Sequence, residues 1–282
     1  MAINNSLVKT TQKKSITEFL NRVDVTANIE QALGKDNRQR FITGVISAVN
    51  TNDALKDCTN GSILSGALLG ETLKLSPSPQ LGHYYLVPYN DKDKGRVAQF
   101  QMGYKGYIQL AIRSGQYKKL NVLAVKKGEL EYFDPLNEDI KINLMIDKWD
   151  EREEAETIGY YAMFELVNGF KKAIYWSKKQ MENHATKYSP GYKAKKGYTF
   201  WEKNFDGMAY KTMLRQLISK WGIMTIDMQS AFESDMTFTD DNGLKQYPEA
   251  DADIIDVTPE VEYQEPTTAS TDNGDVVTTL FN

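Results

Sequence analysis

Lysines and tyrosines alternate through a short stretch in the second half of the chain, and this pairing of residue types points to nucleic acid. Lysine ammonium groups neutralise the phosphates of a nucleic-acid backbone, and tyrosine rings offer flat surfaces on which bases stack. Glycine and proline in the same stretch favour a loop. The stretch contains Lys187, Lys193, Lys195 and Lys196, interleaved with Tyr188, Tyr192 and Tyr198.

A helix is predicted from about Trp201 to Trp221, directly after this loop, with one apolar and one cationic face. At 3.6 residues per turn, Ala209, Met213 and Leu217 continue an apolar stripe, and cations lie two residues away on the far side. A second predicted helix begins at Gly103 and has a polar stripe of its own. A solvated amphipathic helix explains either pattern as well. The two helices carry Lys203, Lys211 and Arg215, and Lys105 and Arg113.

The net charge of −4 conceals an uneven distribution along the chain. Residues 239–282 contain eleven Asp and Glu against one Lys, a net charge of −10, which leaves +6 on residues 1–238. Between Lys171 and Lys220 there are twelve basic residues against three acidic ones. The acidic isoelectric point, about 5.4, therefore comes from the C-terminal segment. The rest of the chain has the charge expected of a protein that binds nucleic acid.

Composition argues against several classes of site. Cys58 is the only cysteine, so one chain can form neither a disulfide nor a cysteine-based zinc site. His83 and His184 are the only histidines, and we assign them to packing or surface roles. No apolar run approaches the roughly 18 residues of a membrane span, and the N-terminus lacks a hydrophobic signal region. We therefore expect a cytoplasmic protein without a membrane segment, metal or cofactor.

Three packing helices are predicted before residue 80. Ser15-Ile16-Thr17-Glu18 is a capping box, which begins a helix that runs to Leu33 and ends at Gly34. A second helix begins at Asp36 or Asn37, and a third covers residues 62–75. Gly66 and Gly70 on the third helix would let another element approach its backbone closely.

From Leu81 the apolar period changes to two, which is typical of strands. Gln99 and Gln101 share one strand face, which we expect to be solvated or to reach phosphates. Residues 148–156 are charged throughout and are predicted to be a loop. A further capping box at Ser177 begins a helix through about Lys187. The predicted strands form a hairpin of residues 81–89 and 97–102, a strand at 120–125, strand and turn segments at 126–143, and a hairpin of 159–167 and 170–176 around Asn168-Gly169.

These elements predict an α+β fold with a small, mostly antiparallel sheet from Leu81 to Trp176, flanked by helices. We expect a single domain between two disordered tails, residues 1–14 and the acidic residues 239–282. The domain, residues 15–238, is expected to contain a helical N-terminal part, a sheet part and a basic helical part, at residues 15–80, 81–176 and 177–238.

Three of these stretches, taken together and in order, resemble the RecT family of phage and prophage single-strand annealing recombinases. The first is Leu81 to Tyr89, with the sequence LGHYYLVPY, and the second runs from Gln101 through Gln116. The third is Trp201 to Lys220, around Met208-Ala209-Tyr210-Lys211-Thr212. The similarity spans roughly residues 40–230.

The resemblance implies a protein that is not an enzyme. It implies binding of single-stranded DNA without strong sequence preference, and pairing of that strand with its complement into nascent duplex. Family members work without ATP, which agrees with the absence of a G-x-x-x-x-G-K-[ST] phosphate loop here. They act as ring or helical homo-oligomers, beside a partner exonuclease and a host single-strand-binding protein.

By position, the resemblance places Lys105, Arg113, Lys211 and Arg215 in the DNA groove. Tyr210 and Gln216 stand where family members often carry a second basic residue. Tyr104, Tyr198 and Phe200 are candidates for stacking on bases, although core packing explains any single ring as well. The complete set predicted to bind DNA is Tyr104, Lys105, Arg113, Lys118, Lys119, Lys193, Lys195, Lys196, Tyr198, Lys203, Lys211 and Arg215.

Two other functions compete with annealing. A metal-dependent nuclease needs clustered carboxylates to hold Mg²⁺. The acidic residues Glu151, Glu153 and Glu154 fall in the predicted loop, and Glu71, Glu129 and Asp206 lie apart in the sequence on structured segments. A structural assembly protein would instead use the basic patch to meet an acidic partner.

Overall fold

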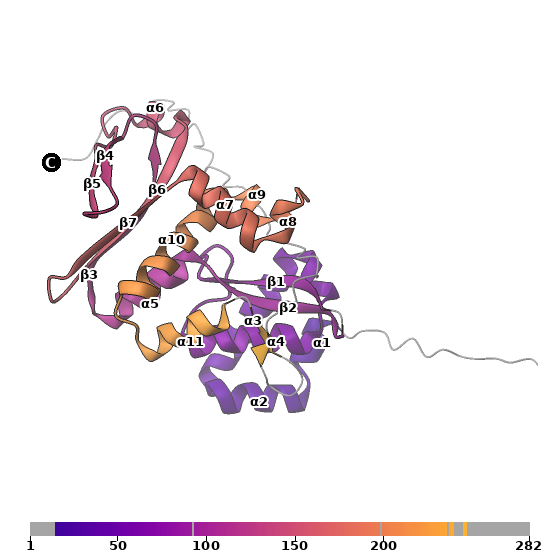
Figure 1. Ribbon diagram of the computed structural model, residues 1–282. Coiled ribbons are helices and arrows are strands. Elements are labelled where there is room, and N and C mark those ends of the chain that lie inside the picture. Colours follow the sequence, from indigo (N-terminus) through magenta and orange to yellow (C-terminus); the bar gives the residue numbers. More distant parts are fainter. Residues whose placement is uncertain (1–14, 92, 198, 236, 240–244, 247–282) are drawn as a thin grey trace, which may run out of the picture.

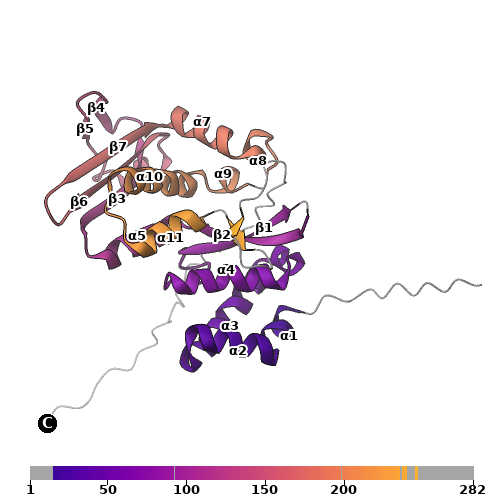
Figure 2. The same ribbon diagram turned by 60° about the horizontal axis from the view of Figure 1, so that its bottom comes forward.

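The computed structural model describes residues 15–91, 93–197, 199–235, 237–239 and 245–246. Within these ranges the chain forms helices and small antiparallel sheets, stacked in layers (Figures 1 and 2). The N-terminal helices form the lowest layer in Figure 2, a β-hairpin with two helices lies above them, and a three-stranded sheet lies at the top. The predicted α+β class is confirmed. The division into a single domain and tails stays a prediction, and residues 1–14 and most of 239–282 lie outside the described residues.

The N-terminal layer consists of helices only. The capping box predicted at Ser15 is present, because the Ser15 hydroxyl accepts a hydrogen bond from the Glu18 N–H and the Glu18 carboxylate accepts one from the Ser15 N–H. The prediction of one helix through Leu33 is wrong. The chain breaks where the Asn21 side chain binds the Thr17 carbonyl and Arg22 becomes extended. The helices are α1 (Ile16–Leu20), α2 (Val23–Leu33), α3 (Lys35–Thr51), the 3-10 helix η1 (Asp53–Asp57) and α4 (Asn60–Thr72).

A hairpin of β1 (Tyr84–Asp91) and β2 (Gly95–Met102) packs against α4. A Cβ atom at Gly70 would lie 2.3 Å from the Tyr84 ring, and one at Gly66 would lie 2.7 Å from a methyl carbon of Leu86. Only hydrogen fits at these two positions. The close approach predicted from the glycine spacing is therefore confirmed.

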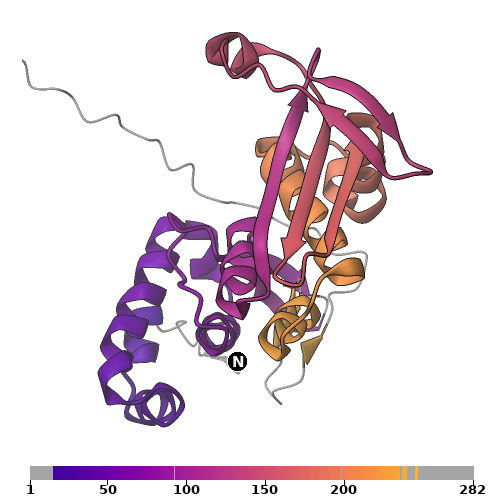
Figure 3. The same cartoon turned by 90° about the vertical axis from the view of Figure 1, so that its left-hand side faces the viewer.

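The single sheet expected between Leu81 and Trp176 is divided into separate antiparallel sheets. Its largest part has the strand order β3-β6-β7, and the turn at Asn168-Gly169 joins β6 to β7 as predicted. A separate hairpin and the short helix α6 lie at one end of this sheet (Figure 3). Residues 148–156, predicted to be a loop, contain α6, which buries none of its residues. The elements are β3 (Tyr117–Lys126), β4 (Leu130–Asp134), β5 (Asp139–Ile142), α6 (Trp149–Glu154), β6 (Thr157–Leu166) and β7 (Lys171–Ser177).

The C-terminal third is mainly helical. The capping box predicted at Ser177 begins α7. The long helix predicted from Trp201 forms in two pieces, because Asn204 ends one helix and its side-chain oxygen caps the next through the Gly207 N–H at 2.9 Å. The elements are α7 (Lys178–Tyr188), α8 (Pro190–Lys193), α9 (Phe200–Lys203), α10 (Phe205–Trp221), α11 (Ile226–Ser234), β8 (Phe238–Thr239) and β9 (Lys245–Gln246). None of the described helices is long and apolar enough to cross a membrane.

Helix α10 belongs to two hydrophobic cores. Ala209, Met213 and Leu217, the stripe predicted to be apolar, pack in the core that covers the three-stranded sheet. Leu214 and Ile218 pack in the other core, with the N-terminal helices, the β1–β2 hairpin and α5 (Tyr104–Ser114). A helix that is buried along two sides has little surface left for solvent. It therefore acts as the joint between the upper and lower layers.

Gly70→Ala is expected to lower the free energy of unfolding by about 1–3 kcal/mol, because the added Cβ would overlap the buried Tyr84 ring. Urea denaturation measures this change. Ser47→Ala, at an exposed position of α3, is the control and should stay within about 0.5 kcal/mol. Equal stability of the two variants would contradict the tight contact between α4 and β1.

Candidate nucleic-acid interface

A small aromatic pocket opens where β1, β2, α5, α9 and α10 meet. The rings of Tyr85 and Phe200 lie 5.7 Å apart between centroids, and those of Tyr104 and Tyr210 lie 5.6 Å apart and nearly perpendicular. The cavity is about 60 Å³, far below the roughly 300–1,000 Å³ of small-molecule sites, so it can meet a base at its rim but cannot enclose one. Its lining residues are Tyr85, Gln101, Met102, Gly103, Tyr104, Phe200, Asn204, Gly207, Met208 and Lys211.

Two glycines fix the position of α5, which brings Tyr104 to this pocket. A Cβ atom at Gly103 would lie 2.1 Å from the Gly82 carbonyl oxygen, and one at Gly106 would lie 2.1 Å from the His83 carbonyl oxygen. The Gly103 N–H also donates to the His83 carbonyl at 2.9 Å. The first turn of α5 is therefore held directly against residues 82 and 83.

The glutamines of β2 do not form the solvated face that their spacing predicted. Gln99 is 2% exposed and Gln101 is 6% exposed. The Gln101 amide nitrogen donates to the Gln99 side-chain oxygen at 2.8 Å. That prediction is wrong because the middle layer is covered on both sides, so the alternation of a strand did not mark a solvent face here.

Four cations, Lys105, Arg113, Lys74 and Arg40, follow one another from the aromatic pocket to the N-terminal helices, and we call them the basic ridge. Lys105 follows Tyr104 in α5 and lies beside Gly82, where a Cβ would be 3.4 Å from its Cδ. At the other end of α5, the Arg113 guanidinium donates to the carbonyl oxygens of Leu73 at 2.7 Å and Lys74 at 3.2 Å. These bonds close the C-terminal end of α4.

His83 is close enough to two cations of the ridge to feel their charge. Its pKa is lowered from the ordinary value, first by burial and then by the positive charges of Arg113 and Lys105. Its Nδ1 accepts a hydrogen bond from the Ser76 N–H at 3.3 Å. The imidazole is therefore exposed to a local positive potential.

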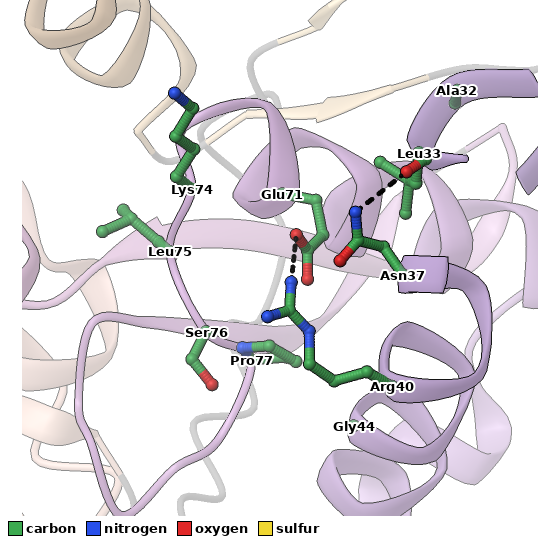
Figure 4. A pocket seen from close by; sticks show the side chains of 10 residues that line it. All are labelled: Ala32, Leu33, Asn37, Arg40, Gly44, Glu71, Lys74, Leu75, Ser76 and Pro77. Carbon is green, nitrogen blue, oxygen red and sulfur yellow. Dashed lines mark hydrogen bonds and ion pairs between the residues drawn. The ribbon is translucent and has the colours of Figure 1, made fainter. Parts of the chain in front are cut away.

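The ridge ends at a larger cavity, about 620 Å³, between the α2–α3 corner and residues 74–77 (Figure 4). Arg40 and Glu71 turn toward one another there, at 3.7 Å, while Lys74 points away from them. The Asn37 amide donates to the Leu33 carbonyl at 3.1 Å. Two cations and one carboxylate line this cavity, so its net charge is positive.

Asp235 organises the buried side of α10. Its carboxylate accepts hydrogen bonds from the Lys211 ammonium at 2.9 Å, the Arg215 guanidinium at 2.8 Å, the Tyr107 hydroxyl at 2.9 Å and the Met102 backbone N–H at 2.9 Å. The Asp235 side chain is 1% exposed. Burial, and then the Asp235 charge, raise the pKa of Tyr107 well above its ordinary value. One carboxylate thus connects the segment after α11 to α10, α5 and β2.

The prediction that α10 turns a cationic face to solvent is therefore wrong at Lys211, which is 7% exposed. Arg215 is half-buried and also donates to the Tyr107 hydroxyl at 3.1 Å. Contact of these two side chains with DNA stays a prediction. Both of them already donate hydrogen bonds to the Asp235 carboxylate.

The remaining predicted cations lie on elements other than those of the ridge. Lys118 and Lys119, together with Lys171, surround the buried Glu165 carboxylate at 2.6, 3.6 and 3.6 Å. The Lys118 hydrogen bond is the main cause of the lowered pKa of Glu165. The predicted cations after α7, all exposed, are Lys193, Lys195, Lys196 and Lys203. Tyr198 lies outside the described residues.

The carboxylates considered for a nuclease do not converge. Glu71 faces Arg40, Asp206 accepts a hydrogen bond from the Tyr160 hydroxyl at 2.5 Å, and Glu129 pairs with Arg152 at 2.6 Å. Over the part of the chain that the structure describes, no group of three or more His, Cys, Asp or Glu side chains could hold a metal ion.

The class that this arrangement describes is an α+β protein whose surface combines a row of cations with aromatic rings. Residues 39–251 match the profile of the RecT family. The chain belongs to the RecT family. This membership places it among proteins of DNA recombination that bind and anneal single-stranded DNA.

Two curated relatives have similar lengths. The Uncharacterized protein YqaK of Bacillus subtilis (strain 168) is 39% identical over 249 residues, which cover 84% of this chain and 82% of the relative. Protein RecT of Escherichia coli (strain K12) is 28% identical over 228 residues, which cover 79% of this chain and 81% of the relative.

Sequence patterns located Tyr104, Lys105 and Arg113 but missed several of their neighbours. Asp235 gave no signal, because it is a single acidic residue close to a segment rich in them. Arg40 lies in α3 and Lys74 lies in the turn after α4, in a part of the chain whose sequence predicts packing helices only. Arg113 brings α5 to Lys74 by its bonds to carbonyls about forty residues earlier, and Arg40 lines the same cavity as Lys74.

Asp235→Asn is expected to lower the free energy of unfolding by about 3–5 kcal/mol, because it leaves the buried Lys211 charge without its counter-ion. Thermal or urea denaturation measures the loss. Glu131→Gln is the control, since its pair with Lys141 is exposed to solvent and surface ion pairs add little to stability. Adding Lys211→Met to Asp235→Asn should recover part of the lost stability, whereas strictly additive losses would show that the two charges are not coupled.

Proposed function

We propose that this chain binds single-stranded DNA along the basic ridge and anneals it to a complementary strand without ATP. The observation that carries the proposal is the adjacency of Tyr104 and Lys105 on the first turn of α5. The ring lines the aromatic pocket, and the lysine beside it is exposed and has no ion-pair partner among the described residues. A single strand offers bases, which can stack on an aromatic ring, and phosphates, which a neighbouring cation can bind.

The chemistry of annealing explains why contacts to the backbone are sufficient. Two strands repel each other through their phosphates, and Lys and Arg cancel that repulsion. Contacts to phosphate carry no base specificity and leave the Watson–Crick edges open to the second strand. A strand whose phosphates contact Lys105 and Arg113 would run on toward Lys74 and Arg40, and the positive cavity would lie at the end of its path.

The other predicted cations would form the rim of the interface. Lys118 and Lys119, together with the exposed lysines after α7, carry the positive charge beyond the ridge. Tyr198 remains a proposed stacking residue. Lys211 and Arg215 serve this interface by holding Asp235, which fixes the position of α5. If they also contact phosphates, removing them will reduce the salt dependence of binding as well as stability.

From the family we further propose assembly as a ring or helical homo-oligomer, and action beside a phage-type exonuclease and a host single-strand-binding protein. A single subunit with one short ridge covers only a few nucleotides. Pairing of two strands over a useful length therefore needs several subunits side by side.

The test is annealing of two complementary labelled oligonucleotides by the purified chain, without ATP, with and without Mg²⁺. Faster formation of duplex with intact strands is expected. Lys105→Gln should weaken single-strand binding and reduce the slope of log affinity against log salt by about 0.7, the loss of one phosphate contact. Lys127→Gln, at an exposed turn far from the ridge, is the matched control.

An unchanged salt slope for Lys105→Gln in a folded protein would contradict the assignment of the ridge. Absence of annealing would reduce the proposed function to binding. Strand cleavage that requires Mg²⁺ would replace annealing with a nuclease function.

Binding of a DNA strand at the basic ridge is expected to raise the pKa of His83. In the unbound protein the pKa of His83 lies below 6.5, so the stability linked to this group is present above pH 6.5 and is lost as pH falls through the lowered pKa. Phosphates on Lys105 and Arg113 would cancel the positive potential and raise that pKa. Binding should then take up a proton and strengthen as pH falls below about 6.5.

Proton NMR can follow this change, because the chain has only two histidines. The ring of His184, which contacts Trp176, Tyr188 and Trp201, is the reference. An upward shift of the His83 pKa on addition of an oligonucleotide, larger than that of His184, is expected. A fixed or falling His83 pKa would place the strand elsewhere.

A further inference from the structure

The segment from Lys127 to Glu156, which contains β4, β5 and α6, forms what we call the acidic lobe. It contains eleven acidic residues against four basic ones, a net charge of −7. It lies at the end of the three-stranded sheet, opposite the N-terminal helices (Figures 1 and 3). A surface of this charge repels a DNA backbone, so the basic ridge and the acidic lobe must serve different ligands.

Several carboxylates of the acidic lobe are exposed and have no partner within the described residues. Others are engaged by nearby cations, as Glu129 is by Arg152, Glu131 by Lys141, and Glu151 by Lys148. Unpaired like charges close together are destabilising unless a cation from outside reaches them. The carboxylates without a hydrogen bond or ion pair are Asp139, Asp147, Asp150, Glu154 and Glu156.

Apolar side chains are exposed among these carboxylates. Ile146 is 66% exposed and Trp149 is 53% exposed. Leu144 also lines a cavity of about 250 Å³ between the β4–β5 hairpin and the sheet, together with Leu123 and Tyr161 of the sheet. Apolar groups beside unpaired charges of one sign mark a surface for a polypeptide of the opposite charge that also carries apolar side chains.

The chain itself contains such a segment. Residues 1–14 have three lysines, Lys9, Lys13 and Lys14, and no acidic residue. Leu7 and Val8 precede the first of these lysines. This segment lies outside the described residues and leads into α1, at the opposite end of the molecule from the acidic lobe (Figure 1). Fully extended, fourteen residues reach at most about 50 Å, enough to span from one subunit onto the next.

We propose that the acidic lobe binds the cationic residues 1–14 of a second copy of this chain. Leu7 and Val8 would meet Leu144, Ile146 and the cavity, and the lysines would meet Asp147, Asp150 and Glu154. Because the donor segment and the acceptor lobe are at opposite ends, the contact is head-to-tail, and repetition gives a ring or an open helical filament. This inference rests on the proposed assembly and is independent of how DNA is bound.

The test uses charge reversal in the full chain, without DNA, and reads the oligomeric state by analytical ultracentrifugation across a range of concentrations. The arm variant is Lys9→Glu/Lys13→Glu/Lys14→Glu, and the lobe variant is Asp147→Lys/Asp150→Lys/Glu154→Lys. Each alone should raise the concentration at which the oligomer dissociates by about tenfold or more, since like charges would face each other. An equimolar mixture should assemble again, because each variant then offers the charge that the other lacks.

Lys35→Glu/Lys179→Glu/Lys220→Glu is the matched control for the arm variant, with the same change of charge at exposed lysines elsewhere. It should assemble as the unaltered chain does. The inference is overturned if either variant assembles normally, if the mixture does not recover assembly, or if the unaltered chain is monomeric at every concentration. Single-strand binding by the same samples, measured separately, shows whether the basic ridge works when assembly fails.

Discussion

A buried carboxylate with four hydrogen-bond donors is the constraint on which the middle of this molecule depends. Asp235 is nearly inaccessible to solvent, so its charge is tolerable only because Lys211, Arg215, Tyr107 and a backbone N–H surround it. Those donors come from α10, α5 and β2, and none of these elements can move relative to the others without losing a charged bond. The first turn of α5, with Tyr104 and Lys105, is positioned in this way.

Helix α10 holds this cluster in the interior of the molecule. One side of the helix packs against the three-stranded sheet and the other packs over α5, so Lys211 and Arg215 lie between two cores. The basic ridge therefore lies mainly on α5 and the turn after α4, and Gly103 and Gly106 let the backbone of α5 touch that of residues 82 and 83. Packing by small residues, rather than a deep cleft, brings the exposed cations into line.

Local signals in the sequence were sufficient for much of the fold and for part of the site. Capping boxes at Ser15 and Ser177, the Asn168-Gly169 turn and the spacing of Gly66 and Gly70 act over a few residues. Each produced the expected helix start, turn or contact, although the helix that begins after Ser15 ends at Leu20 and not at Leu33. The face of α10 was misread because a helical period shows one apolar stripe and does not show a charge buried on the opposite side. Asp235 lies 24 residues from Lys211, and no local pattern encodes such a pair.

Arg113 links the surface to the end of a helix. Its guanidinium fills the bonding needs of two carbonyls after α4, and those carbonyls have no other partner from their own helix. A ligand anion that draws this side chain outward must leave both carbonyls to water, whereas an anion that approaches from outside can share the guanidinium without cost to α4. The resting position of one arginine thus favours shallow, reversible contacts, which is what the proposed annealing surface would need to release each strand once it has found its complement.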